Sequence, residues 1–360
     1  MPKTNLIVVA MSGGVDSAVA AALLVEEGCE VVGVTMRLVD SIGEAAPGSC
    51  CAPADIDDAR SVARLLDIPF YVMDMRREFE ERVIRPFADE YARGRTPNPC
   101  ILCNEFIKFK TLLKRARELN ADALATGHHA RIVMEDGRRM VAKARDRKKD
   151  QSYFLFGLTS DILERIRFPV GEITKEQARI IARELGFKVA DKAESQEICF
   201  VQEGRYDRLV ERYAKDIPQP GDIVAADGRV LGRHKGIHHY TVGQRKGLGV
   251  AAGRPLYVMR LDGTARRVRV GFREECASEG MIVENLVWND SHAPEDGDRT
   301  YVRIRHQGRE IDATLHPESK KRLRVMFIEP QPAVTPGQAA VFYRGELLQG
   351  GGWISPLKNC

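Results

Sequence analysis

The stretch MSGGVDSAV, at residues 11–19, decides the fold of the first half of the chain. It follows the apolar run LIVVA, at residues 6–10, whose short length and β-branched residues predict a buried strand. Glycines in the turn let the backbone approach a ligand, and the free N–H groups at a helix start attract anions. After the turn, apolar residues recur at helical spacing, at Val15, Ala18, Val19 and Ala22. The stretch therefore predicts a strand, a tight turn and a helix that together form a phosphate site.

The turn contains neither of the two common nucleotide-binding motifs, since it lacks the Gly-Lys-Ser/Thr ending of a P-loop and the GxGxxG of a dinucleotide fold. A plain strand-to-helix turn capped by Ser12 is one interpretation. The string SGGVDS also resembles the pyrophosphate-binding loop of the N-type ATP pyrophosphatases, which split ATP between its α and β phosphates and leave an adenylate on a carbonyl oxygen. This resemblance implies that Ser12, Gly13, Gly14 and Ser17 hold the leaving pyrophosphate. Asp16 would help to place a magnesium ion or orient the loop.

The first half of the chain alternates predicted strands and helices. The strands LIVVAM, EVVGVTM and PFYVMDM are followed by helices that begin near Asp16, run through DIDDARSVARLLD and begin near Arg76. A later strand, in ADALATGHHA, ends at Thr126, Gly127 and His128. This alternation predicts an α/β fold with a Rossmann-like parallel sheet, helices on both faces and ligands at the carboxyl ends of the strands.

After about residue 200, short β-type runs separated by Gly, Pro and Asp turns predict small β modules. Pro218, Pro220 and Gly221 mark one candidate boundary, and residues 274–280 mark another. We expect a catalytic α/β domain, a small central β-rich domain and a C-terminal β-barrel, at residues 1–205, 206–275 and 276–360.

Composition predicts a cytoplasmic globular protein. At 360 residues, 44% of them hydrophobic, the chain is long enough for two or three domains. It contains no apolar run of the roughly 18 residues that span a membrane, and it lacks the features of a signal peptide. The eight cysteines are therefore expected to be thiols, metal ligands or catalytic groups, and no membrane partner is expected.

The net charge of +4 excludes little, but the basic residues are clustered. Residues 131–150 contain eight Lys/Arg against four Asp/Glu. A second basic stretch covers residues 260–273, and a third contains Arg303, Arg305, His306 and Arg309. Each cluster alone is typical of a solvated face, whereas several together favour a polyanionic partner.

Two cysteine segments are candidates for thiol chemistry. In RTPNPCILCN, Asn104 is a good N-cap for the amphipathic helix that follows. Cys103 would then lie at a helix N-terminus, where the helix amides and Lys108 favour its thiolate. Cys199 lies in the apolar run EICFV, so it is either a small buried hydrophobe or a functional thiol.

The same cysteines raise the question of a metal. In a four-ligand zinc site, Cys100 and Cys103 would be half of the ligands, but no second CxxC or spaced His pair completes the set, so zinc is disfavoured. A [4Fe-4S] cluster on Cys100, Cys103 and Cys199 is chemically reasonable and would leave one iron open to bind sulfur. Cys50 and Cys51 have no derivable role, and the remaining thiols, Cys29, Cys276 and Cys360, are treated as incidental.

Several strings, in order along nearly the whole chain, resemble the bacterial tRNA-specific 2-thiouridylase family. They are SGGVDS, CCAPADIDDARSVARLLDIPFYV, GRTPNPCILCNEFIKF, ATGHHARI, KKDQSYFLFGL, KAESQEICFV and GDIVAADGRVLGRHKGIHHYTVGQRKGLG. The resemblance implies conversion of the wobble uridine, position 34, of Glu, Gln and Lys tRNAs to 2-thiouridine. It also implies that the central domain and the C-terminal barrel contact the anticodon arm.

The resemblance further implies a mechanism in which ATP, with Mg²⁺, adenylates the C2 oxygen of the uridine. Cys199 would carry a persulfide received from a sulfur-relay protein or a cysteine desulfurase. Cys103 would either attack that persulfide to release sulfide or act as the nucleophile, and the cycle would end with a Cys103–Cys199 disulfide.

Binding residues follow from the same resemblance. The ATP-binding positions are Ala10, Met11, Ser12, Gly13, Gly14, Val15, Asp16, Ser17, Met36 and Gly127. The region of the target base is Asn98, Pro99 and Cys100. The tRNA-contacting positions are His128, Lys149, Asp150, Gln151, Arg305, His306 and Gln338.

One departure from the family pattern affects the mechanism, because the best-described branch has aspartate where this chain has Cys100. Cys100 could be a general base as thiolate, a third sulfur carrier or a cluster ligand. We favour persulfide chemistry over a cluster. Two further function classes, an amide-forming ligase of the ATP pyrophosphatase type and a nonenzymatic RNA-binding protein, are disfavoured by the Cys103/Cys199 pair and by SGGVDS respectively.

Overall fold

The computed structural model describes residues 5–39, 53–193, 198–201, 205–250 and 252–357. These residues form two compact units. The first contains Met1–Val83, Cys100–Gly204 and Glu346–Leu348, and the second contains Ile84–Pro99, Arg205–Gly345 and Gln349–Cys360. Within the described ranges, no helix has both the length and the apolar character needed to cross a membrane.

The first unit is built on a five-stranded parallel sheet in the order β3-β2-β1-β4-β7. Its strands are β1 (Leu6–Ala10), β2 (Glu30–Arg37), β3 (Phe70–Asp74), β4 (Ala123–Thr126) and β7 (Ile166–Arg167). The chain moves outward from β1 to β3 and then returns to place β4 on the other side of β1. A ligand crevice is expected at this reversal, at the carboxyl ends of β1 and β4.

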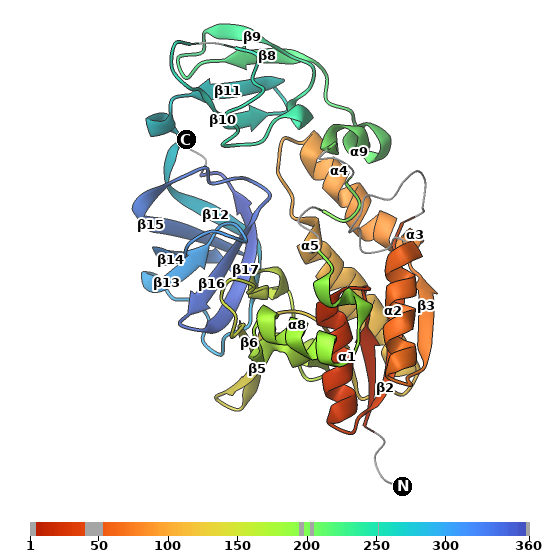
Figure 1. Ribbon diagram of the computed structural model, residues 1–360. Coiled ribbons are helices and arrows are strands. Elements are labelled where there is room, and N and C mark those ends of the chain that lie inside the picture. The colour runs from red at the N-terminus through yellow and green to blue at the C-terminus, as the bar shows by residue number, and fades with distance from the viewer. Residues whose placement is uncertain (1–4, 40–52, 194–197, 202–204, 251, 358–360) are drawn as a thin grey trace. The chain divides into compact units, whose positions relative to one another are not determined.

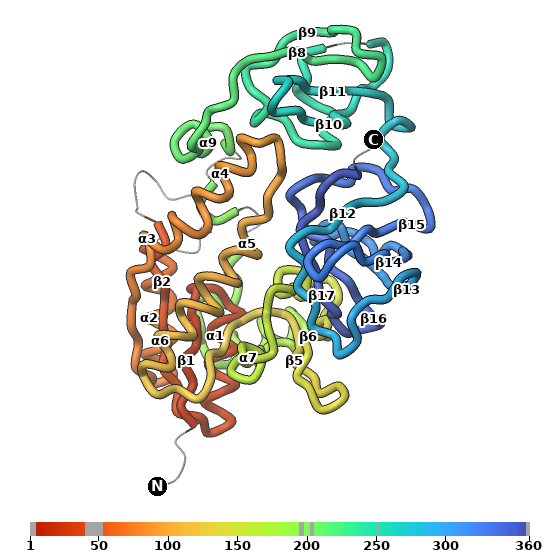
Figure 2. Tube along the Cα trace, turned by 180° about the vertical axis from the view of Figure 1, so that it is seen from behind, coloured from red at the N-terminus to blue at the C-terminus, as the bar shows by residue number. Residues whose placement is uncertain are grey.

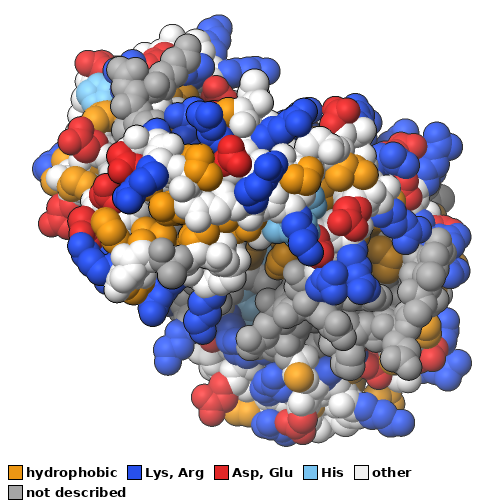
Figure 3. All heavy atoms as spheres, turned by 90° about the horizontal axis from the view of Figure 1, so that it is seen from above, with side chains coloured by type: hydrophobic (Ala, Val, Ile, Leu, Met, Phe, Trp, Pro, Cys, Tyr) orange, Lys and Arg blue, Asp and Glu red, His pale blue; other side chains and the backbone are white. Residues whose placement is uncertain are grey.

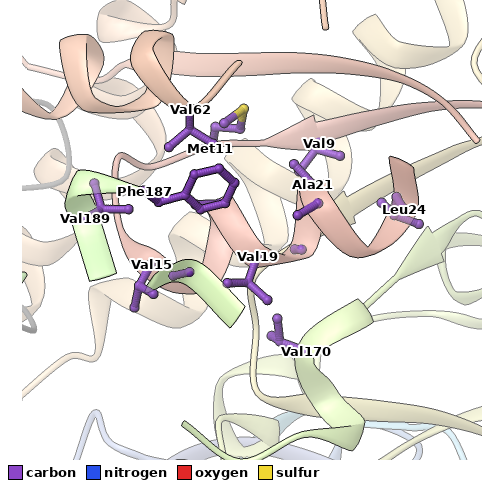
Figure 4. Close-up of a cluster of buried hydrophobic side chains, with 14 of the residues drawn as sticks. Val9, Met11, Val15, Val19, Ala21, Leu24, Val62, Val170, Phe187 and Val189 are labelled. Atoms are coloured by element: carbon purple, nitrogen blue, oxygen red, sulfur yellow. The ribbon is translucent and has the colours of Figure 1, made fainter. Parts of the chain in front are cut away.

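One face of the sheet is covered by α1 (Val15–Glu26), α2 (Pro53–Leu65) and α8 (Lys175–Glu184). Their apolar side chains form a single core with β1, in which Val9, Val19 and Leu24 are at most 1% exposed. Figure 4 shows Phe187 and Val189 from the segment after α8 packed into this core beside Met11 and Val15. The loop between β1 and α1 is thereby anchored to the packed core.

The connection from β3 to β4 forms the helices on the other face, as right-handed crossovers require. It includes α3 (Arg76–Phe79), the π-helix η1 (Glu80–Ile84), α5 (Pro99–Leu102), the π-helix η2 (Cys103–Leu112) and α6 (Leu113–Glu118). Figure 1 shows α1 and α8 in front of the sheet, and Figure 2, seen from behind, brings α6 into view. Ile107, Phe109 and Leu112 on η2 are fully buried.

A β-hairpin of β5 (Ala130–Glu135) and β6 (Arg138–Lys143) follows β4, and Leu347 pairs with Ala142 of β6. The remaining short elements of this unit are η3 (Ser152–Leu155), α7 (Ser160–Leu163), η4 (Pro169–Glu172) and η5 (Lys188–Asp191). The basic segment at residues 131–150 is thus largely a hairpin, and two of its arginines, Arg131 and Arg147, pair with Glu346.

The second unit contains two helices and a four-stranded sheet with its own apolar core. The helices are α4 (Arg85–Ala92) and α9 (Tyr206–Tyr213), and the ring of Tyr206 stacks on Tyr91 at 5.6 Å between centroids. The sheet order is β10-β11-β8-β9, with strands β8 (Gly221–Val224), β9 (Val230–His234), β10 (Tyr257–Asp262) and β11 (Arg267–Gly271). The short 3-10 helix η6 (Ile237–His239) lies between β9 and β10 in sequence, and η7 (Arg273–Cys276) follows β11.

The C-terminal part is an antiparallel barrel in the order β12-β15-β14-β13-β16-β17, closed by pairing of β17 with β12. Its strands are β12 (Ala277–Trp288), β13 (Asp298–Arg303), β14 (Ile311–Ser319), β15 (Arg322–Pro332), β16 (Ala339–Arg344) and β17 (Leu347–Ser355). Alternate side chains fill the interior, among them Val283, Val325 and Phe342, which are fully buried.

The predicted fold class is confirmed, because a parallel Rossmann-like sheet is followed by a small β-rich sheet and a β-barrel. The domain boundaries at residues 205 and 275 stay a prediction. The compact units are two and not three, and two segments cross the predicted boundaries: Ile84–Pro99 belongs with the second unit, and Glu346–Leu348 belongs with the first.

Candidate active site

The loop between β1 and α1 has the geometry of an anion site. Gly13 has a φ of 73°, and a Cβ there would lie 2.2 Å from the backbone oxygen of Asp55, so the position requires glycine. Gly14 is the N-cap of α1, and no side chain caps the helix. The Ser17 hydroxyl donates to the Gly14 carbonyl at 3.0 Å and accepts the Ser12 N–H at 3.1 Å. Helix amides without a cap and two serine hydroxyls together suit a phosphate group.

Asp16, in the first turn of α1, is held by two side chains from distant parts of the first unit. Lys175 Nζ donates to its two carboxylate oxygens at 2.8 and 2.7 Å, and His129 Nε2 lies 3.0 Å from Oδ1. Burial raises the pKa of Asp16, but the hydrogen bonds and charges of His129 and Lys175 outweigh burial and lower the pKa below 3.8. Asp16 is therefore an oriented carboxylate anion at neutral pH.

A second lysine secures the other side of the loop. Lys192 Nζ donates to the Gly13 carbonyl at 3.0 Å and to carboxylate oxygens of Asp55 and Asp58, each at 2.5 Å. Burial lowers the pKa of Lys192, but the two carboxylates outweigh it and raise the pKa above 10.5. The ammonium group thus ties the loop to the start of α2.

The end of β4 lies directly against this loop. A Cβ on Gly127 would lie 2.5 Å from the Ser17 nitrogen and 2.6 Å from the Asp16 carbonyl carbon. The next residue, His128, is only 8% exposed, and its Nδ1 lies 2.6 Å from Thr126 Oγ1. Burial lowers the pKa of His128 well below 6.5, and Lys108, whose Nζ is 3.5 Å from Nε2, lowers it further.

The segment after the hairpin extends the network around Asp16. Gln151 Oε1 accepts the His129 N–H at 2.9 Å, and the Gln151 N–H donates to the His129 carbonyl at 2.8 Å. Asp150 is buried, and its Oδ1 accepts the N–H groups of Ala144 and Ser152 at 3.1 and 3.2 Å. Gln151 thus fixes the backbone of His129, which in turn contacts Asp16, and Asp150 fixes the turn that carries Gln151.

The structure corrects the prediction that Asn104 caps a helix with Cys103 at its N-terminus. The helix begins at Pro99, so Cys103 lies a turn inside it, at the start of the π-helical segment η2. Asn104 is buried, and its Nδ2 donates to the Phe154 carbonyl at 3.3 Å. The proline fixes φ and suits the first helical position, which explains the earlier start. Cys100 is exposed and Cys103 is half-buried.

Cys199 lies in a turn whose following residues, Phe200 and Val201, are held by packing and a hydrogen bond. Val201 is buried and donates its N–H to the Ile198 carbonyl at 2.9 Å, and the Phe200 ring packs edge-on against Phe79 at 5.5 Å between centroids. The thiol itself is half-buried, so Cys199 is not a fully buried core residue.

The three thiols are not a compact metal site in this structure. Over the described ranges, the sulfur atoms of Cys100, Cys103 and Cys199 do not form a set within 4.8 Å of one another. They therefore do not hold a single ion in the arrangement seen here. Cys50, Cys51 and Cys360 lie outside the described residues.

The remaining predicted positions are distributed over both units. In the first unit, Met36 is half-buried on β2 and Lys149 is half-buried in the turn after the hairpin. In the second unit, Arg305 is exposed, while Gln338 Nε2 donates to the Thr96 carbonyl at 2.9 Å. His306 and Asn98 are half-buried, and Pro99 is buried. Figure 3 shows Lys and Arg side chains interspersed with carboxylates on one face of the molecule.

Sequence reasoning missed the three side chains that hold the loop, His129, Lys175 and Lys192. Each is far along the chain from its partner: 113 residues from His129 to Asp16, 159 from Lys175 to Asp16 and 179 from Lys192 to Gly13. The string TKEQ does signal a helix start, since Thr174 and Gln177 form a capping box. It does not indicate that Lys175 points to Asp16.

Three family models match consecutive parts of the chain. They are the tRNA methyl transferase HUP domain at residues 5–203, the tRNA methyl transferase PRC-barrel domain at residues 208–272 and the aminomethyltransferase beta-barrel domain at residues 278–354. The tRNA-specific 2-thiouridylase of Carboxydothermus hydrogenoformans is 49% identical over 357 residues, which cover 97% of each chain. The chain belongs to the tRNA-specific 2-thiouridylase family.

Other members of the 2-thiouridylase family match over the same length. The protein of Syntrophotalea carbinolica is 48% identical over 98% of this chain and 99% of its own. The protein of Acetivibrio thermocellus is 45% identical over 97% of this chain and 98% of its own. The resemblance predicted from the quoted strings is thereby confirmed, and it extends over the whole architecture.

Proposed function

We propose that this chain is an ATP-dependent tRNA uridine 2-sulfurtransferase that converts uridine 34 of Glu, Gln and Lys tRNAs to 2-thiouridine. The observation that carries the proposal is the uncapped start of α1 behind Ser12–Ser17, with Asp16 held by Lys175 and His129, in a chain of the 2-thiouridylase family. Such a loop binds the pyrophosphate that leaves when ATP adenylates an oxygen atom. Neither a ligase nor an RNA-binding protein needs the two cysteines as well.

In the first step, the C2 oxygen of the uridine attacks the α phosphate of ATP and pyrophosphate leaves. The α1 amides and the hydroxyls of Ser12 and Ser17 bind the leaving pyrophosphate, which stabilises the charge that develops on it. The remaining nucleotide positions, Met36 and Gly127, lie near the carboxyl ends of β2 and β4. The C2 oxygen leaves as part of AMP in the second step.

Magnesium fits this site as a companion of the phosphates of ATP. Mg²⁺ is usually held by substrate phosphates together with one or two carboxylates. The nearest carboxylate on the loop, Asp16, already accepts hydrogen bonds from Lys175 with both oxygens. We therefore assign Asp16 the orienting role of the two that the sequence allowed.

In the second step, sulfur is transferred from a persulfide on Cys199. The terminal sulfur of the persulfide attacks C2 and AMP leaves, so that a C2–S–S–Cys199 adduct forms. The Cys103 thiolate then attacks the sulfur of Cys199, the sulfur–sulfur bond of the adduct breaks, and 2-thiouridine leaves with the electron pair. Alternatively, Cys103 attacks the persulfide first and releases sulfide as the nucleophile. Either route ends in a Cys103–Cys199 disulfide, which an external reductant returns to thiols.

Cys100 takes the position that aspartate has in the best-described branch of the family. It is exposed, so a base as thiolate and a third sulfur carrier are both open to it. The alternative mechanism is a [4Fe-4S] cluster on Cys100, Cys103 and Cys199. We favour the persulfide route, which needs only two thiols, Cys199 to carry the sulfur and Cys103 to release it.

Transfer RNA is the polyanionic substrate, and its anticodon loop presents an unpaired base. Arg305 is exposed and suits a phosphate contact. His306, Lys149, Gln151, Gln338, Asn98 and Pro99 remain proposed contacts to tRNA. His128 and Asp150 are buried, so we assign them positions behind the site that support Lys108 and the loop of Gln151. A cysteine desulfurase or sulfur-relay protein supplies the sulfur, and the reaction takes place in the cytoplasm.

The test is reconstitution with unmodified tRNA transcripts, ATP, Mg²⁺ and a cysteine desulfurase with cysteine. We expect 2-thiouridine at position 34 by mass spectrometry of nucleosides, and none in a transcript with cytidine at that position. ATP consumption without 2-thiouridine, in the presence of an active donor, would contradict the proposed function. Iron and acid-labile sulfide in anaerobically purified protein, lost in Cys100→Ser, would replace the persulfide route by the cluster.

A further inference from the structure

The second unit contains a cluster of metal-ligating side chains outside the candidate active site. Glu211 comes from α9, and His238 and His239 come from the 3-10 helix η6. One ligand atom from each of the three residues lies within 4.8 Å of the others. Two imidazoles and a carboxylate therefore converge where α9 meets the segment after β9.

His238 gives the second and independent indication of a ligand. It is only 4% exposed, and neither of its ring nitrogens has a hydrogen-bond partner in the part of the chain that the structure describes. Buried polar atoms are nearly always paired, so an imidazole of this kind needs an explanation. The ring packs against Gly236, where an added Cβ would lie 2.4 Å from its Cε1 atom, and this contact fixes the ring in place.

We propose that Glu211, His238 and His239 bind one zinc ion. Zinc takes imidazole nitrogen at about 2.0–2.1 Å and carboxylate oxygen at about 2.0–2.2 Å, often with three protein ligands and a water molecule. Glu211 and His239 are exposed and free to rotate toward the fixed ring of His238. The donor set excludes Ca²⁺ and Mg²⁺, which prefer oxygen ligands, whereas imidazole suits zinc and its neighbours in the first transition row.

The surroundings of His238 suit a bound cation. The rings of His238 and His239 lie close together, with 4.2 Å between their centroids. The carboxylates that face His238 are Glu211 and Asp207, one turn apart on α9, which favour a cation. The neighbouring His234 is already engaged, because its Nε2 lies 3.1 Å from the Arg266 carbonyl oxygen.

The bound zinc ion ties α9 to the segment before the basic loop at residues 241–249. Both elements belong to the second unit, where α9 precedes β8 and η6 follows β9 along the chain. Zinc would therefore stabilise the fold of this part and hold the start of the loop, without entering the chemistry of thiolation.

The experiment uses the untagged full-length protein, freed of metal by a chelator, with Zn²⁺ added in competition with a chromophoric chelator. The variants are His239→Ala and Glu211→Gln, whose exposed side chains are removable without loss of the fold. The matched control is His316→Ala in the barrel, which removes a histidine that contacts Thr314 and Asp296. Any zinc bound by the cysteines contributes equally in all of these proteins, because every variant keeps the cysteines.

We expect one zinc ion that is bound at least about tenfold more weakly by His239→Ala and Glu211→Gln, since even outer-shell partners of a metal contribute about 10- to 100-fold. The His316→Ala protein should bind zinc as the wild type does. Zinc should also raise the thermal unfolding midpoint of the wild type and not that of His239→Ala. Equal zinc affinity in the wild type and His239→Ala, or a wild type that binds no zinc, would overturn the proposal.

Discussion

The Nζ atom of Lys175 donates to both carboxylate oxygens of Asp16, at 2.7 and 2.8 Å, although 159 residues separate the two in sequence. The contact joins the first turn of α8 to the first turn of α1. It therefore fixes the amide groups of α1 relative to the core below them. In the proposed enzyme, this places the pyrophosphate site before ATP arrives.

Replacement of this lysine tests the value of the contact. The free energy of unfolding of the Lys175→Met protein should be about 1–3 kcal/mol lower than that of the wild type. This loss is smaller than the roughly 3–5 kcal/mol typical of a broken buried ion pair, because Asp16 is 30% exposed. Urea denaturation at pH 7 measures the difference. The matched control, Arg183→Ala, breaks the exposed pair with Asp191 near the other end of α8 and should leave the urea midpoint unchanged. Equal midpoints for all three proteins would mean that the contact does not stabilise the fold.

Gly127 tests the close approach of β4 to the loop. In Gly127→Ala, the new Cβ would meet the backbone of Asp16 and Ser17, which is unable to move without displacing α1. A misplacement of about 1 Å costs on the order of 100-fold in rate, so kcat for thiolation should fall by about that factor. Gly157→Ala is the control, because the atoms nearest to its Cβ belong to the flexible side chain of Glu105, the closest at 3.3 Å. If Gly127→Ala thiolates tRNA as fast as the control, the loop tolerates the displacement and the assignment of Gly127 is wrong.

Protonation of His128 should destabilise the folded protein in mild acid. Its pKa is lowered well below 6.5 by burial, with Lys108 and His129 adding to the effect, so the unfolded chain binds the proton more readily than the folded one. Stability is then complete above about pH 6.5 and falls as the pH drops below it, by up to about 1.4 kcal/mol per pH unit. The free energy of unfolding, measured by urea denaturation between pH 7 and pH 5, should fall less steeply with decreasing pH in His128→Gln than in the wild type. The same dependence on pH in both proteins would show that His128 does not contribute.

Cys199 separates the two proposed chemical steps. The Cys199→Ser protein should still release pyrophosphate from ATP and form adenylated tRNA, because adenylation does not use the thiol. The AMP should stay on the uridine, because no persulfide displaces it. It should form no 2-thiouridine, and Cys103→Ser should at most accumulate the adduct with Cys199. Release of pyrophosphate and formation of 2-thiouridine are measured in the same reaction. Thiolation by Cys199→Ser would refute the persulfide assignment.

The sequence was sufficient for the elements whose signals are local. The runs at residues 6–10 and 30–37 are continuous and β-branched, and both are strands of the parallel sheet. The loop between β1 and α1 was also predictable, because glycine, serine and a helix start are adjacent in sequence. A strand that is buried on both faces leaves a pattern of apolar residues that needs no partner to be read.

Contacts between distant segments were not predictable. Lys192 reaches Gly13 and Asp55 from a segment whose own sequence is an ordinary polar stretch. The helix start was also misread, because Asn104 has the chemistry of a cap while Pro99 defines the actual beginning. Local preference for a cap was overruled by burial of Asn104 against the Phe154 carbonyl, which is a tertiary effect.

The cluster of Glu211, His238 and His239 shows the same limit. The paired histidines are visible in the sequence, but the glutamate comes from a helix that precedes them by more than twenty residues. Their spacing fits no common zinc motif. Only the packing of α9 beside η6 brings the three side chains together.

The most direct test of the central claim follows the C2 oxygen of uridine 34. A tRNA carrying ¹⁸O at that oxygen is thiolated with unlabelled ATP, and the AMP product is analysed by mass spectrometry. Adenylation at C2 predicts that the ¹⁸O atom appears in the phosphate of AMP, with one labelled AMP for each 2-thiouridine formed. Unlabelled AMP accompanying 2-thiouridine would contradict adenylation of the uridine and, with it, the proposed mechanism.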